Sequence, residues 1–232
     1  MKEKKIQELN NLVRTSYDSI ATHFDLTRKK RVWPQIEEYC KRVKEGEAVL
    51  DLACGNGRLL GSLFDKKINY LGIDVSSQLI NIAQKNYPKH KFIVGNVLDI
   101  ESILEKGESY DYIFFLAALQ HIPGHKNRLE LLKKIKNYLN DSGVLVISNW
   151  NLWSSKHRFR IIKAGVYKLL GLNKLNFGDI IFFWKDAKGE NRAKRYYHAF
   201  TKRELLFLAK KSGFEQISLK KDKYNYWLEL KK

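Results

Sequence analysis

The first 45 residues carry hydrophobic side chains at three- and four-residue steps, the spacing of an amphipathic helix. We expect this helix to run from about residue 6 to residue 24. A second helix should end near Val43, because Pro34 suits the first turn of a helix. The apolar stripe of the first helix comprises Ile6, Leu9, Val13, Tyr17, Ile20 and Phe24.

The next hundred residues alternate short apolar runs with helical patterns. Strands are expected near residues 49–53, 70–73, 91–94, 111–116 and 143–149. Alternation of this kind predicts a parallel sheet with helices on both faces and right-handed crossovers.

The C-terminal part of the chain predicts one more helix and a strand hairpin. Thr201 and Glu204 form a capping box at the start of the helix. Residues 215–221 and 224–230 then read as two antiparallel strands joined by a turn through Asp222. The predicted fold class is therefore α/β, a doubly wound, mostly parallel seven-stranded sheet.

Residues 151–200 interrupt this pattern, because they show no clean alternation and hold many of the aromatic side chains. We expect one structural domain in four parts. These are an N-terminal helical extension (1–45), a cofactor-binding core (46–150), a substrate-recognition insertion (151–200), and the last helix with its closing hairpin (201–232).

The first candidate site is the run from Val49 to Arg58, a buried strand followed by a glycine turn. Gly55 and Gly57 have no Cβ and would let the backbone approach a ligand. A helix beginning near Arg58 would direct its positive amide end at that ligand. A strand-to-helix turn without a ligand is the structural alternative.

The spacing of this turn disfavours a dinucleotide. In G-N-G-R-L-L-G the third glycine, Gly61, comes one residue later than in the dinucleotide motif. Asp51 would also repel a diphosphate, whereas it suits a ligand with a cationic end. S-adenosylmethionine carries both an ammonium and a sulfonium, and we expect it as the cofactor.

Asp74 ends the second predicted strand, 23 residues after Asp51. A carboxylate at that place binds the ribose diol in nucleoside-binding α/β sheets. Alternatively Asp74 could cap the following helix, although Ser76 could take that part instead.

Composition excludes several classes of protein. The N-terminus lacks an apolar secretory segment, and the longest apolar run, residues 112–119, is too short to cross a bilayer. Cys40 and Cys54 lack metal-like spacing and suggest no disulfide framework. We expect a cytoplasmic protein without metal and without a membrane association.

The net charge of +18 is unevenly distributed. Residues 46–150 hold 12 Lys and Arg against 11 Asp and Glu, whereas residues 151–200 hold 11 against three. A neutral core with basic flanks favours a polyanionic substrate. The alternative, a lysine-rich surface without a specific partner, predicts an even distribution.

The ordered motifs V-L-D-L-A-C-G-N-G, G-I-D-V-S, G-N-V-L-D and Y-D-Y-I resemble a class I S-adenosylmethionine-dependent methyltransferase. Ile20-Ala21-Thr22-His23-Phe24, Thr27-Arg28, Trp33-Pro34, Phe182-Phe183-Trp184 and Arg195-Tyr196-Tyr197-His198-Ala199-Phe200 are similar to the tRNA wobble-uridine carboxymethyl methyltransferases. This resemblance implies methyl esterification of 5-carboxymethyluridine, with the tRNA anticodon stem-loop as substrate. It also implies a possible small activator subunit.

The resemblance and the two carboxylate positions together give two sets of site residues. The cofactor set is Asp51, Ala53, Cys54, Gly55, Asn56, Gly57, Asp74, Val75, Asn96, Val97 and Leu116. The substrate-positioning set is Arg28, Trp33, His121, Trp150, Arg195, Tyr196, Tyr197 and His198. Two positions depart from the family, which often has a second histidine at Gln120 and an aspartate at Asn96. The Asn96 carbonyl oxygen can still accept a bond from the adenine amino group.

Methyl transfer to a carboxylate needs no general base, because a carboxyl group of pKa ~4 is ionised at neutral pH. Positioning and the exclusion of water would then supply most of the acceleration. Arg28 and Arg195 are the candidates to orient the carboxylate, since guanidinium bonds both oxygens. His121 could bond the uracil ring or be a satisfied structural cap.

The aromatic residues Trp33, Trp150, Tyr196 and Tyr197 could stack on the wobble base or pack the insertion on the sheet. A methyltransferase for a small-molecule oxygen or carboxylate acceptor would share the core motifs and differ only in its flanks. Leu116-Ala117-Ala118-Leu119 lacks the polar turn of a base N-methyltransferase. Neither cysteine is placed for a 5-methylcytosine enzyme, and a non-catalytic RNA-binding protein would not need Asp51 and Asp74 at nucleoside spacing.

Overall fold

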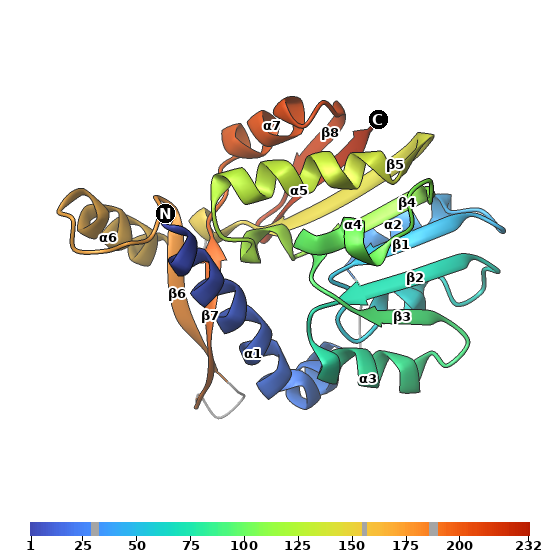
Figure 1. Ribbon diagram of the computed structural model, residues 1–232, viewed down its shortest axis with the longest axis horizontal. Coiled ribbons are helices and arrows are strands. Elements are labelled where there is room, and N and C mark those ends of the chain that lie inside the picture. Colours follow the sequence, from blue (N-terminus) through green and yellow to red (C-terminus); the bar gives the residue numbers. More distant parts are fainter. Residues whose placement is uncertain (29–32, 155–156, 186–189) are drawn as a thin grey trace.

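The central sheet has seven strands in the order β3-β2-β1-β4-β5-β9-β8 in a computed structural model that describes residues 1–28, 33–154, 157–185 and 190–232 (Figure 1). Strands β1 to β5 are parallel, whereas β9 runs antiparallel to both β5 and β8. This confirms the predicted fold class. The strands are β1 (Ala48–Leu52), β2 (Asn69–Asp74), β3 (Lys91–Val94), β4 (Tyr110–Leu116), β5 (Leu139–Trp150), β8 (Glu215–Lys221) and β9 (Asn225–Lys231).

Helices cover both faces of this sheet, because each central strand is apolar on both sides. In β1, Leu50 and Leu52 point into the core beneath α5 and α7, whereas Val49 joins the opposite core beneath α2 and α3. This two-residue period follows from the pleat of a strand. The helices are α2 (Pro34–Arg42), α3 (Ser77–Asn86), α4 (Ile100–Ile103), α5 (His125–Asn137) and α7 (Lys202–Lys211).

Strand order reverses between β1 and β4, since the chain leaves β1 toward β2 on one side and later returns to β4 on the other. In an open α/β sheet, the crevice beyond the carboxyl ends of such strands is where ligands bind. The glycine turn follows β1, and Asp74 ends β2. The fold therefore brings both sequence motifs to one crevice.

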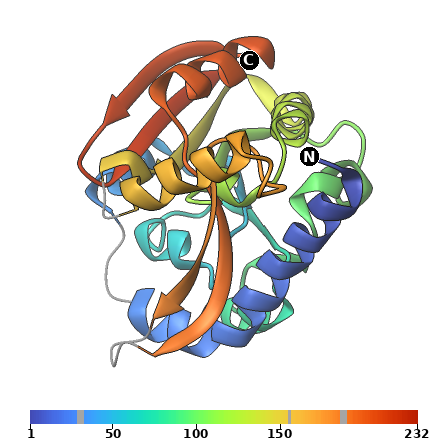
Figure 2. The ribbon, with the colours of Figure 1, turned by 90° about the vertical axis from the view of Figure 1, so that its left-hand side faces the viewer.

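Three segments outside the sheet lie on the side of the molecule that faces the viewer in Figure 2. They are α1 (Glu3–Arg28), α6 (Arg158–Leu169) and the two-stranded antiparallel hairpin of β6 (Asp179–Lys185) and β7 (Asn191–His198). Helix α1 packs against this hairpin: the Ser16 hydroxyl donates to the Lys194 carbonyl of β7, and Ile20 clusters with Trp184 of β6 and Ala193 of β7. The described part of the insertion thus contains a helix and two strands, which the sequence pattern, with no clean alternation there, did not identify.

The segment after the glycine turn differs from the prediction. Instead of a full helix beginning near Arg58, the chain forms one short 3₁₀ helix, η1 (Arg58–Ser62). Its backbone enters through Gly57 in the left-handed region, with φ of 75°. A helix this short supplies little of the dipole that we expected to face the ligand.

Gly57 and Gly46 provide a matched pair for testing the turn. Both have left-handed φ values, +75° and +80°, but a Cβ at Gly57 would lie 3.1 to 3.2 Å from Tyr87 and Phe92, whereas a Cβ at Gly46 meets nothing within 4 Å. We expect Gly46→Ala to lower the free energy of unfolding by about 1 kcal/mol through backbone strain alone. Gly57→Ala should cost ~2 to 3 kcal/mol, because overpacking adds to the strain. Denaturant titration measures both values, and equal losses would contradict the packing role of Gly57.

Candidate active site

A pocket lies at the carboxyl ends of β1, β2 and β4 and is covered by α1 and the β6–β7 hairpin. Two alanines of its lining, Ala53 after β1 and Ala117 after β4, have left-handed backbones with φ of 55° and 52°. This conformation costs a non-glycine residue about 1 to 2 kcal/mol. Backbone strain on two neighbouring strands therefore coincides with the pocket, as is common at functional sites.

Asp74 lies in the pocket at the end of β2. Its carboxylate accepts the backbone amides of Gly55 and Ser76, each at 2.8 Å. Burial raises its pKa to about 6, and these two amides partly offset that rise. Ser76 rather than Asp74 caps α3, since its Oγ accepts from the Leu79 amide. The remaining lone pairs of Asp74 are those that a ribose diol would use.

Asp51 lies one strand away and is also buried. Burial raises the pKa of its carboxyl to about 7, although the Tyr70 hydroxyl donates to it at 2.9 Å and the charge of Arg58 lowers it. A carboxylate held in this way gains its counter-ion from a ligand. A primary ammonium fits this site, because it carries both charge and donors.

The predicted cofactor residues come together at this pocket with one exception. Asn96 lies in the lining, where its Oδ1 accepts the Leu98 amide at 3.1 Å and keeps a second lone pair for a ligand. Gly57 does not line the pocket. It lies in the turn, at a place where a Cβ would come too close to Tyr87 and Phe92. The residues of the predicted set that line the pocket are Asp51, Ala53, Cys54, Gly55, Asn56, Asp74, Val75, Asn96, Val97 and Leu116.

Arg195 lines the end of the pocket opposite the cofactor residues. It is 3% exposed, and its guanidinium carbon lies 4.0 Å from the centre of the Trp184 ring. Its closest polar contact is a weak donation to the Tyr17 hydroxyl at 3.4 Å, and its buried Nε has no hydrogen-bond partner. Within the described residues, no carboxylate forms an ion pair with Arg195. A buried guanidinium in this state is suited to an anionic partner.

His121 lines the same end but is fully satisfied by protein groups. Its Nδ1 donates to the Tyr196 carbonyl, so its Nε2 accepts from the Tyr17 hydroxyl, both at 2.9 Å. Burial, and then the charge of Arg195, lower its pKa to about 3. The imidazole is therefore neutral at physiological pH and holds Tyr17 in place, which favours its structural interpretation.

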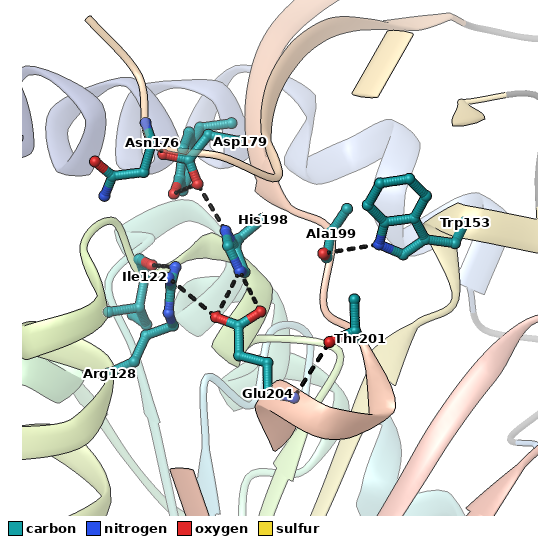
Figure 3. Close-up of polar contacts among 10 residues, drawn as sticks. Ile122, Arg128, Trp153, Asn176, Asp179, His198, Ala199, Thr201 and Glu204 are labelled. Atoms are coloured by element: carbon teal, nitrogen blue, oxygen red, sulfur yellow. Dashed lines mark hydrogen bonds and ion pairs between the residues drawn. The ribbon is translucent and has the colours of Figure 1, made fainter. Parts of the chain in front are cut away.

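Three members of the predicted substrate set, Tyr196, Tyr197 and His198, do not line the pocket, and their contact with a substrate stays a prediction. The Tyr196 hydroxyl and His198 Nδ1 both bind Asp179 at 2.7 Å, and His198 Nε2 lies 2.9 Å from Glu204 (Figure 3). Tyr197 is wholly buried behind the pocket, stacked on Phe182. Neither tyrosine has an exposed ring face on which a base could stack.

The other predicted substrate residues, Arg28, Trp33, His121, Trp150 and Arg195, do line the pocket. Gln120 does not line it and is fully buried, with its side-chain oxygen accepting the Trp150 amide at 2.7 Å. Gln120, the residue that departs from the family, therefore holds the Trp150 backbone in place from outside the pocket.

Several pocket residues belong to neither predicted set, among them Tyr17, Phe24, Arg58 and Trp184. Tyr17 and Phe24 belong to the apolar stripe of the first helix, which read as core. Their seven-residue separation places both rings on one helix face, with centroids 5.9 Å apart. The signals in the sequence were the hydroxyl group of Tyr17 within this stripe and the presence of Phe24 and Trp184 in the motifs that carry the family resemblance.

Across the described ranges, no cluster of His, Cys, Asp and Glu is suited to a metal ion, and no helix is long and apolar enough to span a membrane. Cys40 and Cys54 are both free and buried. The expected cytoplasmic location stays a prediction.

A profile described as a methyltransferase domain matches residues 43–229. The chain belongs to this family. It is 25% identical to a tRNA (carboxymethyluridine(34)-5-O)-methyltransferase of Schizosaccharomyces pombe, over 97% of both chains. It is 30% identical to the Saccharomyces cerevisiae protein of the same name over 61% of this chain, and spans about half (49%) of that relative. A Methanosarcina mazei SAM-dependent methyltransferase structure superposes with a TM-score of 0.67 at 23% identity, covering 87% of this chain and 98% of that one.

The predicted resemblance, the methyltransferase activity and S-adenosylmethionine as cofactor are thereby confirmed. The pocket also fits this cofactor by its own chemistry. Asp51 suits the ammonium, Asp74 the ribose, and Gly55 leaves room for close approach beside Phe24. Val75, Val97 and Leu116 supply apolar surface for a nucleoside.

Cofactor affinity should depend on pH through Asp51. Its carboxyl, with a pKa raised to about 7, is largely protonated at pH 5.5 and mostly ionised at pH 7.5. Because the ammonium binds the ionised form, we expect the Kd for S-adenosylmethionine to fall about tenfold across this range.

Isothermal titration at a series of pH values measures this dependence. Tyr70→Phe removes the hydroxyl that donates to Asp51 and should move the transition to higher pH. Asp51→Asn should weaken binding and flatten the part of the profile near pH 7. A wild-type profile independent of pH would show that Asp51 does not bind the ammonium.

Proposed function

We propose that this methyltransferase converts 5-carboxymethyluridine at the tRNA wobble position to its methyl ester. The observation that carries the proposal is the buried, unpaired guanidinium of Arg195 in the pocket. A carboxylate acceptor would supply the missing anion and bond two guanidinium nitrogens at once. The names of the S. pombe and S. cerevisiae relatives support a carboxymethyluridine acceptor.

The walls around Arg195 are suited to a planar base that carries a carboxylate. Trp150 and Trp184 line the pocket beside it, with their ring centres 5.9 and 4.0 Å from the guanidinium carbon. The Arg28 guanidinium carbon lies 5.5 Å from the centre of the Trp184 ring and adds a second positive charge. An aromatic wall gives a flipped base a surface for stacking, as single-stranded RNA recognition requires.

The proposed mechanism uses the residues of this chain to bind, orient and exclude water. S-adenosylmethionine, when bound, supplies a methyl group made electrophilic by its sulfonium. Arg195 holds the acceptor carboxylate so that one oxygen faces the methyl, while Tyr17 fixes the guanidinium. No proton has to be removed, because the acceptor is already ionised and His121 is neutral and fully bonded.

The basic insertion supports a polyanionic substrate. Helix α6 exposes Arg158, Arg160 and Lys163, and α6 belongs to residues 151–200 with their net charge of +8. Cations on this surface would neutralise tRNA phosphates around the anticodon stem-loop. The recognition role of the insertion and the requirement for a small activator subunit stay predictions.

The product of the reaction tests this proposal. The purified chain is incubated with methyl-labelled cofactor and a tRNA that carries 5-carboxymethyluridine, and the digested nucleosides are analysed by mass spectrometry. We expect label in the methyl ester of the wobble nucleoside. The same tRNA with unmodified uridine should stay unlabelled, because it has no carboxylate.

Arg195→Gln should lower kcat/KM for the carboxymethylated tRNA at least about 100-fold, since it removes a charge-assisted pair. Arg203→Gln is the matched control, because it removes the same charge at the exposed surface of α7, outside the basic insertion. Label in a small molecule but not in carboxymethylated tRNA would instead favour a small-molecule acceptor.

A further inference from the structure

Three arginines occupy the pocket, which is more than one acceptor carboxylate requires. Their aromatic contacts give them an order. Arg28 and Arg195 both lie against Trp184, with guanidinium carbons 5.5 and 4.0 Å from the centre of its ring, whereas Arg58 lies against Trp33. The row therefore has Arg58 at one end and Arg28 with Arg195 at the other. Burial, and then the charge of Arg28, lower the pKa of Arg58 to about 10, and the charge of Asp51 opposes this change.

Arg58 is held at the cofactor end by its position in the chain and by one aromatic ring. It is the first residue of η1, directly after Gly57. Its guanidinium carbon lies 4.5 Å from the centre of the Trp33 ring, which fixes the plane of the group and leaves its edge free. Within the part of the chain that the structure describes, Arg58 forms no ion pair or side-chain hydrogen bond.

The amino-acid end of S-adenosylmethionine sets a strict requirement on its receptor. Its ammonium and carboxylate are attached to the same carbon, so the protein must offer a negative and a positive group side by side. Asp51 is the negative group, and Arg58 is the pocket arginine on the same strand-and-turn unit, since Asp51 lies in β1 and Arg58 begins η1 directly after the glycine turn. Arg195 lies instead beside Tyr17 and Trp184, on α1 and the β6–β7 hairpin.

We propose that Arg58 binds the carboxylate of the cofactor's amino-acid end, which leaves Arg195, assisted by Arg28, for the carboxylate of the acceptor. This inference rests on the cofactor half of the proposed function and is independent of the identity of the acceptor. It divides the arginine row between two anions that must occupy the pocket together without exchanging places.

Removing the carboxylate from the ligand tests the assignment directly. S-adenosylmethionine and decarboxylated S-adenosylmethionine share the adenosine, the sulfonium and the ammonium, and differ in the carboxylate alone. Isothermal titration at pH 7.5 should show that Arg58→Gln weakens binding of S-adenosylmethionine about 10- to 100-fold. Affinity for the decarboxylated ligand should change less than ~3-fold, and Arg58→Lys should restore part of the preference because it keeps the charge.

Arg28→Gln and Arg195→Gln are matched controls, because each removes one positive charge from the same pocket. Both should keep the wild-type ratio of the two affinities. The assignment is overturned by an Arg58→Gln variant that binds both ligands as wild type does or loses affinity for both equally. It is also overturned if either control abolishes the ratio.

The binding of the decarboxylated ligand reports that the Arg58 variants are folded. If the proposed acceptor is wrong, the ratio of the affinities for the two ligands still depends on Arg58 as predicted. If the proposed role of Arg58 is wrong, carboxymethylated tRNA is still converted to its methyl ester. The two failures are therefore distinguishable.

Discussion

The site depends on one buried positive charge that the described chain does not neutralise. Arg195 is almost wholly enclosed, and a guanidinium in that position costs free energy until an anion arrives. The fold supports this charge with the faces of aromatic rings and with the Tyr17 hydroxyl, which His121 orients. These groups stabilise the guanidinium but do not neutralise its charge. Selectivity for a carboxylate follows, because a neutral acceptor would leave the charge unpaired.

The position of Arg195 is fixed from outside the pocket. The next residues of β7 are tied to the core, since Tyr196 and His198 both bind the buried Asp179 and His198 also binds Glu204 of α7 (Figure 3). Glu204 in turn lies 3.6 Å from Arg128 of α5. One end of the hairpin is thus anchored to the helices that cover the sheet. From this anchor, β7 places Arg195 in the pocket.

The sequence predicted the sheet, the cofactor turn and Asp74, because each depends on a local pattern: two-residue periodicity, glycine spacing, and a carboxylate at a strand end. It grouped Arg195, Tyr196, Tyr197 and His198 as substrate residues, whereas in the structure only Arg195 of these four lines the pocket. Side chains alternate along a strand, so Arg195 and Tyr197 share one face while Tyr196 and His198 share the other. The role of Tyr17 could not be predicted for a different reason. The helical stripe that carries it both packs against the hairpin and lines the pocket. Only the tertiary placement of α1 separates these roles.

The central claim is that Arg195 receives the acceptor carboxylate. The most direct measurement is the structure of the chain bound to S-adenosylhomocysteine and an anticodon stem-loop that carries 5-carboxymethyluridine. The account predicts both carboxylate oxygens within hydrogen-bond distance of the Arg195 guanidinium, about 2.7 to 2.9 Å, with the base against the aromatic wall. A carboxylate bound elsewhere, with Arg195 still unpaired, would contradict it.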